Sequence, residues 1–132
     1  MAKNEGMSTP MESGERKEIG SYSDYTEVCR ELVAKTEGKE FTEEDALALV
    51  AARAEFLEKV KEGKIGTFGT SPVEKWAPTL VEDTKATLEG KGWNAYSRNA
   101  LYISLQAGGV FSSETPAMKY VENLWKQTET TE

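Results

Sequence analysis

The side chains best suited to acid–base chemistry are two adjacent acids, Glu82 and Asp83, and two tyrosines, Tyr96 and Tyr102. A general acid and a general base must face one another across a substrate. Adjacent residues on a helix diverge by about 100°, so Glu82 and Asp83 cannot form such a pair. We therefore predict no catalytic residues and expect that the protein is not an enzyme.

The sequence gives little support for a metal or cofactor site. It contains no His, which is both the commonest general base and the commonest transition-metal ligand. Three consecutive acids, Glu43, Glu44 and Asp45, favour the start of a helix, where the dipole stabilises negative charge. Three adjacent helical residues point in different directions, which argues against a cation site. We predict no metal ligand.

Two further features have a structural interpretation that is stronger than the functional one. If the protein bound a cofactor, the three tryptophans, Trp76, Trp93 and Trp125, would be the candidates for its binding site. Aromatic residues on helices usually belong to the core, so we predict no cofactor. The segment 63–70 has the glycines of a phosphate-binding loop but lacks the Lys-Ser/Thr pair after the last Gly. We expect a structural turn there.

Five segments must position these residues, and each has apolar residues at helical spacing. The first is capped by Ser23 or Asp24 and carries Cys29 on its apolar stripe, which predicts a buried thiol. The others begin at Thr42, at Ser71-Pro72, near Gly92 and at Pro116, and Gly or polar residues separate them. Short loops between helices favour antiparallel neighbours. The sequence thus predicts an all-α protein, an up-and-down antiparallel bundle of four to five helices.

The domain organisation follows from the same pattern. Residues 1–22 are polar and have no apolar period, which predicts a flexible N-terminal arm. Residues 23–127 form the predicted bundle domain, and residues 128–132 form a frayed tail. One domain is what a chain of 132 residues predicts.

The segment from Gly92 to Phe111 is the most aromatic, and we expect the bundle to be organised around it. Its predicted buried stripe lies at helical spacing and consists of Trp93, Tyr96, Ala100, Ile103 and Ala107, widened by Leu101 and Leu105. Arg98 is the only charge between Lys91 and Glu114. A charge on so apolar a helix indicates either an internal ion pair or a contact with a partner, and we favour the internal ion pair.

The overall charge indicates the kind of partner. The net charge is −7 and the isoelectric point is about 4.8, which disfavours binding to a phosphate backbone and predicts no nucleic acid. No run reaches the roughly 18 apolar residues of a membrane span, so we expect no transmembrane segment. A basic protein surface is the expected partner. The candidate partner-binding residues are Arg98, Glu43, Glu44, Glu82 and Asp83.

The sequence GWNAYSRNALYISLQ, with Trp93, Tyr96, Arg98, Asn99 and Leu101, resembles a W-x-x-(V/Y)-x-(R/N)-x-x-L pattern. The PsbQ-like extrinsic proteins of photosystem II, of diatom or algal type, carry that pattern on a helix of a four-helix bundle. The segment from Thr115-Pro116 to Lys126 is similar in plan to their closing helix. The resemblance covers the C-terminal third, where one helix follows the Trp-bearing helix instead of the two in PsbQ.

This resemblance implies a non-enzymatic subunit in the thylakoid lumen that is peripheral to the membrane through protein contacts. Such proteins dock on the lumenal face of the photosystem II core and stabilise or shield the oxygen-evolving centre without ligating its metals. The alternative is a cytosolic acidic helical adaptor or inhibitor of bacterial or phage type that binds another protein in the cytoplasm. A targeting peptide ahead of Met1 would favour the lumen, and a native Met1 would favour the cytoplasm.

Overall fold

The computed structural model of the chain describes residues 18–65 and 72–130, and for 72–76 and 128–130 it describes the backbone alone. Its helices are α1 (Tyr22–Ala34), α2 (Glu43–Lys61), α3 (Pro72–Leu88), α4 (Ala95–Ala107) and α5 (Pro116–Thr130). These ranges contain no β-strand. The prediction of an all-α bundle is confirmed.

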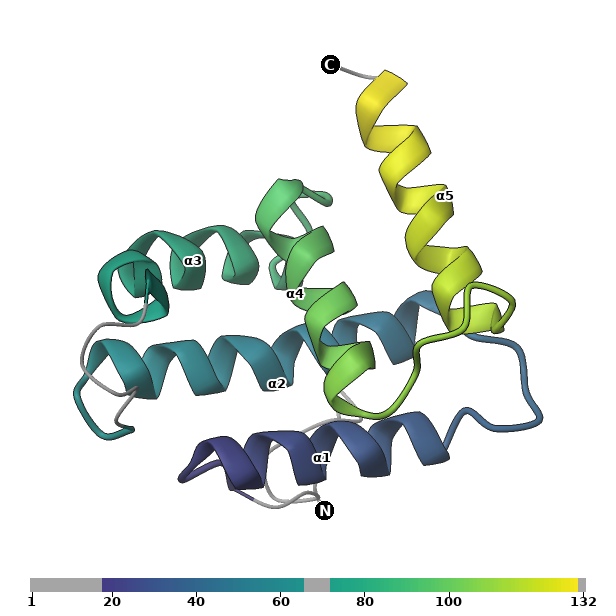
Figure 1. Cartoon of the computed structure of the whole chain (residues 1–132). Helices are drawn as coiled ribbons and strands as arrows, with labels where there is room; N and C mark the ends of the chain where they lie inside the picture. The colour runs from purple at the N-terminus through teal and green to yellow at the C-terminus, as the bar shows by residue number, and fades with distance from the viewer. Residues whose placement is uncertain (1–17, 66–71, 131–132) are drawn as a thin grey trace, which may run out of the picture.

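The helices are arranged in two groups that cross (Figure 1). Helices α1, α2 and α3 run beside one another with alternating direction, as short connections favour. Helices α4 and α5 run antiparallel to each other and lie across the first group. Helix α4 packs against each of the other four helices, whereas α5 packs against α4 alone.

Local capping signals explain where the helices begin. Thr42 caps α2 as predicted, and it forms a reciprocal capping box with Asp45. Thr115 accepts a hydrogen bond from the backbone N–H of Met118, at 3.2 Å, at the predicted start of α5. Helix α1 begins slightly earlier than predicted because Ser21, rather than Ser23 or Asp24, is its cap.

Helix α2 supplies the centre of the core. It packs against α1, α3 and α4, so it is buried on three sides. Helical spacing in the sequence predicts a buried stripe of Ala46, Leu47, Val50, Ala54, Leu57 and Val60. The buried residues extend well beyond it and include Ala48, Leu49, Ala52, Arg53 and Phe56. The expectation that Gly92–Phe111 organises the bundle is thus only half right: α4 contacts the most helices, but α2 has the most buried residues.

The buried face of α4 is rotated from the predicted one. Tyr96 is 45% exposed, and Trp93 is only half buried ahead of the helix. The fully or nearly fully buried residues are Ser97, Ala100, Leu101, Ser104 and Leu105. Small serines allow α4 to lie close to its neighbours, and both hydroxyls find buried hydrogen-bond partners. The buried residues therefore still recur at helical spacing, but they include polar serines in place of the predicted aromatic residues.

The folded domain begins before residue 23. Ile19 is fully buried, its N–H donates to Glu55 at 3.1 Å, and its carbonyl accepts from Lys59 at 2.6 Å. The predicted arm therefore extends at least four residues too far along the chain. The single apolar side chain of Ile19 is enough to hold this polar segment against the bundle. Residues 1–17 lie outside the described part, as do 131–132 of the predicted tail, and the backbone of α5 is helical to Thr130.

Candidate functional site

A groove of about 530 Å³ lies between two loops that are distant in sequence. One is the α1–α2 loop, residues 35–42, and the other is the α4–α5 loop, residues 108–115; the two loops lie on the same side of the molecule (Figure 1). We call these loops and the first turns of α2 and α5 the groove end. The apolar residues that line the groove are Val33, Phe41, Val110, Phe111, Pro116 and Ala117.

The α1–α2 wall is held by hydrogen bonds within a tight turn. The N–H and the hydroxyl of Thr36 both donate to the carbonyl of Val33, at 2.9 and 2.7 Å. Gly38 follows with a φ of 75°, a conformation that favours glycine. The chain then turns inward so that Phe41 is buried directly before the capping Thr42. This wall is therefore fixed by local interactions.

The opposite wall depends on a close approach between α4 and α1. A Cβ atom on Gly108 would lie 2.7 Å from Cγ2 of Val33 and 2.9 Å from the carbonyl oxygen of Cys29. Only glycine fits there without displacing α1. The loop then folds back, because the N–H of Val110 donates to the carbonyl of Leu105 at 2.9 Å. The predicted glycine stop of this helix is confirmed, with a φ of 94° at Gly109.

Apolar surface remains uncovered at this groove. Phe111 is 71% exposed, the highest value among the large apolar residues of the described chain. Val33 and Val110 are only half buried. Beneath them the ring of Phe41 packs edge-on against Tyr120, with centroids 5.4 Å apart. An apolar hollow with an exposed aromatic residue at its margin makes the groove a candidate binding surface.

Acidic side chains surround this apolar surface and have no cationic partners among the described residues. Glu37, Glu40, Glu43 and Glu114 are exposed, and no ion pair joins any of them to a described residue. Lys39 is the one cation lining the groove among described residues, and Lys35 and Lys119 are exposed at the same end, against six acids, Glu37, Glu40, Glu43, Glu44, Asp45 and Glu114. Burial, and then the negative charge of Glu43, raise the pKa of Tyr120. The groove end therefore carries an excess of negative charge.

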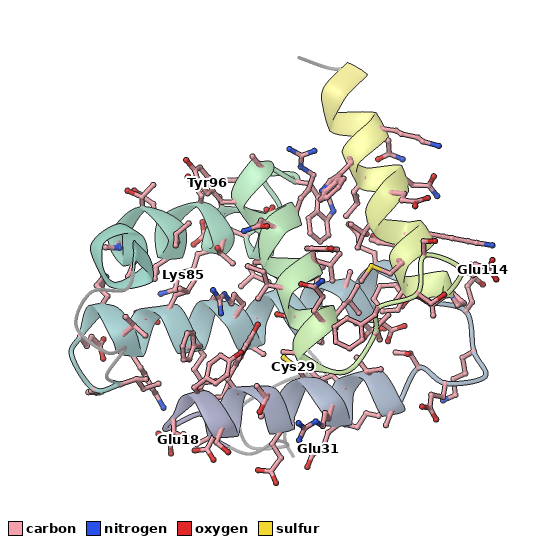
Figure 2. All side chains as sticks on the ribbon, in the orientation of Figure 1. Glu18, Cys29, Glu31, Lys85, Tyr96 and Glu114 are labelled. Atoms are coloured by element: carbon pink, nitrogen blue, oxygen red, sulfur yellow. The ribbon has the colours of Figure 1, made fainter. Side chains whose placement is uncertain are left out.

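The opposite side of the molecule uses its charges internally. Lys59 binds Glu18 at 2.9 Å and Glu55, four residues earlier on α2, at 3.3 Å. Lys85 of α3 binds Glu58 of α2 at 3.0 Å. Figure 2 shows Glu18 and Lys85 on this side and Glu114 on the other. We call residues 18–20, the C-terminal half of α2 and Lys85 the paired end.

A buried polar cluster joins α1, α2 and α4 and was not predicted. The hydroxyl of Tyr25 is 2.6 Å from that of Ser104, which donates to the carbonyl of Leu49 at 3.3 Å. The guanidinium of Arg53 lies 5.3 Å from the centroid of the Tyr25 ring and 5.2 Å from that of Phe56. This cation–π geometry allows the charge of Arg53 to be 93% buried with no ion pair to a carboxylate of the described residues.

The chemistry of this cluster is structural. Burial raises the pKa of Tyr25 far above its ordinary value, against the lowering effect of Arg53, so its hydroxyl stays protonated at neutral pH. Cys29 lies nearby, between α1 and α4 (Figure 2), and it is buried as predicted. A protonated phenol and a buried thiol have little nucleophilic character. Two features of the sequence point to this cluster: Arg53 lies within the apolar segment that forms α2, and Ser97 and Ser104 lie seven residues apart on α4.

The five predicted partner-binding residues do not converge on one site. Glu43 and Glu44 are exposed at the start of α2, at the groove end. Glu82 is exposed on α3, where the carbonyl of Asp83 accepts a hydrogen bond from the side chain of Asn94. Half-buried Arg98 forms no ion pair with a described residue, and its Nε is buried without a hydrogen bond. The internal salt bridge favoured for Arg98 is therefore not found within the described residues.

The residues considered for catalysis or cofactor binding are also separate. Tyr96 is exposed, whereas the hydroxyl of Tyr102 accepts a hydrogen bond from Gln106 at 3.1 Å. Trp93 packs against Tyr120, and Trp125 packs against Tyr102, so they belong to different aromatic contacts. The side chain of Trp76 and most of the predicted 63–70 turn lie outside the described residues. In the described chain, no group of three acidic or Cys side chains is arranged to hold a metal ion.

Comparison with known proteins identifies no relative. No family model matches the sequence, and neither a curated protein nor a solved structure matches it. The resemblance to PsbQ-like proteins therefore remains a prediction from the motif around Trp93. No helix in the described ranges is long and apolar enough to cross a membrane.

Proposed function

We propose that this protein is a non-enzymatic binding subunit that docks its groove end on a basic surface of a larger protein assembly. The observation that carries this proposal is the set of acids without ion pairs around an exposed apolar groove. Charges that the fold does not use are available to a partner, and complementary charges accelerate and orient association. The buried polar cluster, by contrast, is enclosed among three helices and offers no surface to a partner.

The first partner to test is the lumenal face of the photosystem II core, which the motif around Trp93 suggests. Docking there would place the protein in the thylakoid lumen, where it would stabilise or shield the oxygen-evolving centre through protein contacts. The alternative partner is a cytosolic protein bound by an acidic adaptor or inhibitor. An acidic groove end suits both partners, and the pull-down below distinguishes them.

The experiment is a pull-down from thylakoid membranes with two charge-reversal variants of equal net charge. The groove variant is Glu37→Lys/Glu40→Lys/Glu114→Lys. The control variant reverses exposed acids away from the groove, Glu31→Lys/Glu82→Lys/Glu122→Lys. Both change the net charge from −7 by the same amount, and circular dichroism should confirm that both remain helical.

We expect wild type and control to retain photosystem II, the groove variant to lose it, and a salt wash to release it. If only the control variant loses photosystem II, the α3 face with Glu82 replaces the groove end as the docking surface. If the wild type fails to bind thylakoid membranes but captures a defined cytosolic protein in a groove-dependent way, the adaptor function replaces the photosystem role. If both variants bind as the wild type does, the proposal is wrong.

A further inference from the structure

The groove end offers two kinds of contact side by side, which specify more than a generally basic partner. An apolar hollow of about 530 Å³ is open to solvent beside an exposed aromatic ring, Phe111. This volume lies within the range of roughly 300–1,000 Å³ for sites that enclose a ligand. A long-range electrostatic contact needs no such hollow. The hollow therefore indicates that part of the partner is inserted.

The lining determines the chemistry of the inserted group. Phe41 forms the floor, and Val33, Val110 and Pro116 contribute apolar sides. Gly108 and Gly109 add backbone without side chains, which leaves the hollow wide. Charged atoms placed against this floor would lose hydration without a buried partner. The inserted group is accordingly an apolar side chain, either aliphatic or aromatic.

The rim determines what flanks that side chain. Glu37 and Lys39 both lie in the lining. Glu40 and Glu114 are exposed on the two loops that form the walls, and Lys35 is exposed where the first loop begins. The acids of the rim therefore outnumber its cations by three to two. Arginine suits this rim better than lysine, because its planar guanidinium can bind a carboxylate through two parallel hydrogen bonds. It can also stack on the exposed ring of Phe111. The flanks should thus carry arginine.

A second copy of this chain is a poor occupant. Each copy carries a net charge of −7, and a symmetric interface through the groove would bring the same acids face to face. Like charges in contact oppose association. A small apolar molecule would fill the hollow without using the acids at all. A partner segment satisfies both the floor and the rim.

We infer that the groove binds a short partner segment in which an apolar side chain is inserted between flanking arginines. This inference rests on the proposed function and names the recognition element of the same docking surface. The segment spans the gap between the α1–α2 loop and the α4–α5 loop. Because Gly108 and the Thr36 turn hold both walls in place, binding should require little rearrangement.

The test uses short synthetic peptides and the full chain, with binding measured by calorimetry and by amide chemical shifts. The probe carries Leu-Phe between two pairs of Arg. One matched peptide has Ala-Ala in place of Leu-Phe, and another has Glu in place of every Arg. We expect the probe to bind with shifts confined to residues 33–41 and 108–117. Each matched peptide should bind at least about tenfold more weakly.

Variants of the protein identify which of its residues contact the probe peptide. Phe111→Ala should weaken binding of the probe by about tenfold, because it removes the ring on which a flanking arginine stacks. Tyr96→Ala, which removes another exposed aromatic residue, should leave it unchanged. Glu37→Gln/Glu114→Gln should weaken binding several-fold and reduce its dependence on salt.

Three results would overturn the inference. Equal binding of the Ala-Ala peptide would reduce the interaction to surface charge, and equal binding of the Glu peptide would remove the role of the rim. Self-association of the wild type that Phe111→Ala abolishes would assign the groove to a second copy. If the peptides fail but the groove charge reversal still abolishes the pull-down, docking at the groove end stands and only the inserted side chain is wrong.

Discussion

The paired end and the groove end are stabilised by different interactions, although α2 runs through both. At the paired end, Lys59 joins the residues before α1 to α2, and Lys85 joins α3 to α2. At the groove end, the acids have no ion pairs with described residues, and side-chain caps at Thr42 and Thr115 secure the helices. Charged side chains that form ion pairs between helices stabilise the fold, whereas charged side chains without an ion pair are available to bind a partner.

The two ends also use their aromatic residues differently. Tyr25, next to the paired end, is fully buried and stacks on Phe56 with centroids 5.0 Å apart. Phe111 at the groove end is 71% exposed. A buried ring contributes to stability through the water it excludes, and an exposed ring contributes only when a partner covers it. Four sets of variants test this division, from the largest expected effect to the smallest.

Truncation of the two rings should give opposite results. We expect Tyr25→Ala to lower the free energy of unfolding by about 3–5 kcal/mol, the usual loss for a buried aromatic side chain. Phe111→Ala should change it by less than about 0.5 kcal/mol, as for a surface position. Urea unfolding followed by circular dichroism measures both. Losses of similar size would contradict the division between a stabilising ring and a binding ring.

Gly108→Ala tests whether the groove depends on the close approach of α4 to α1. The added Cβ would lie 2.9 Å from a backbone oxygen, so the helices must separate. We expect a loss of about 1–3 kcal/mol in the free energy of unfolding, as for overpacking. Amide shifts should change at both walls of the groove. The φ of Gly108 is −85°, a conformation that alanine adopts readily, so a loss in this variant reports crowding against α1 and not backbone strain.

Local signals in the sequence predict much of this fold. The caps at Thr42 and Thr115, Pro116 at a first helical position, and the glycines that end α4 each act within a few residues, so the helices can be found without knowing their neighbours. The buried thiol of Cys29 follows from the stripe of its own helix. The single apolar residue Ile19 carried no such period, and it was assigned to the arm.

The features that escaped prediction depend on neighbours that are far away in sequence. Arg53 looks like an outward-facing charge until the rings of Tyr25 and Phe56 are placed beside it. Ser97 and Ser104 look like surface residues until Thr87 and Tyr25 supply buried partners. The groove has two walls from opposite ends of the chain, and neither wall has a motif of its own. Such sites require the tertiary structure.

Thr42→Ala tests how the groove end is held. The variant removes the hydroxyl that accepts the N–H of Asp45 and that donates to its carboxylate. We expect a loss of about 1 kcal/mol in the free energy of unfolding, as for other caps. Hydrogen exchange should accelerate in the first turn of α2. Ser and Asp at this position restore a cap, so Thr42→Ser should recover most of the loss. Failure of Thr42→Ser to recover it would show that the threonine methyl group, rather than the cap, stabilises this end.

The smallest expected change in the free energy of unfolding comes from replacing Lys59 at the paired end, and Lys39 at the groove end is the comparison. The hydrogen bond to Glu18, together with the contact with Glu55 and against the opposing effect of burial, raises the pKa of Lys59 above its ordinary value of 10.5. The folded state therefore holds this proton more tightly than the unfolded chain does. The resulting stabilisation is complete below the unfolded pKa and is lost as pH rises through the folded pKa.

Lys59→Met should accordingly cost about 0.5–1 kcal/mol at neutral pH, within the range for partly exposed ion pairs. The difference between wild type and variant should shrink as pH is raised above about 10.5, since Lys59 then becomes neutral in the wild type too. Lys39→Met should show no difference at any pH, because Lys39 has no ion pair with a described residue. Urea unfolding across a pH series measures both variants. A deficit of Lys59→Met that persists in full at the alkaline limit would assign the role of Lys59 to the packing of its aliphatic chain, and the paired end would then be held by packing rather than by charge.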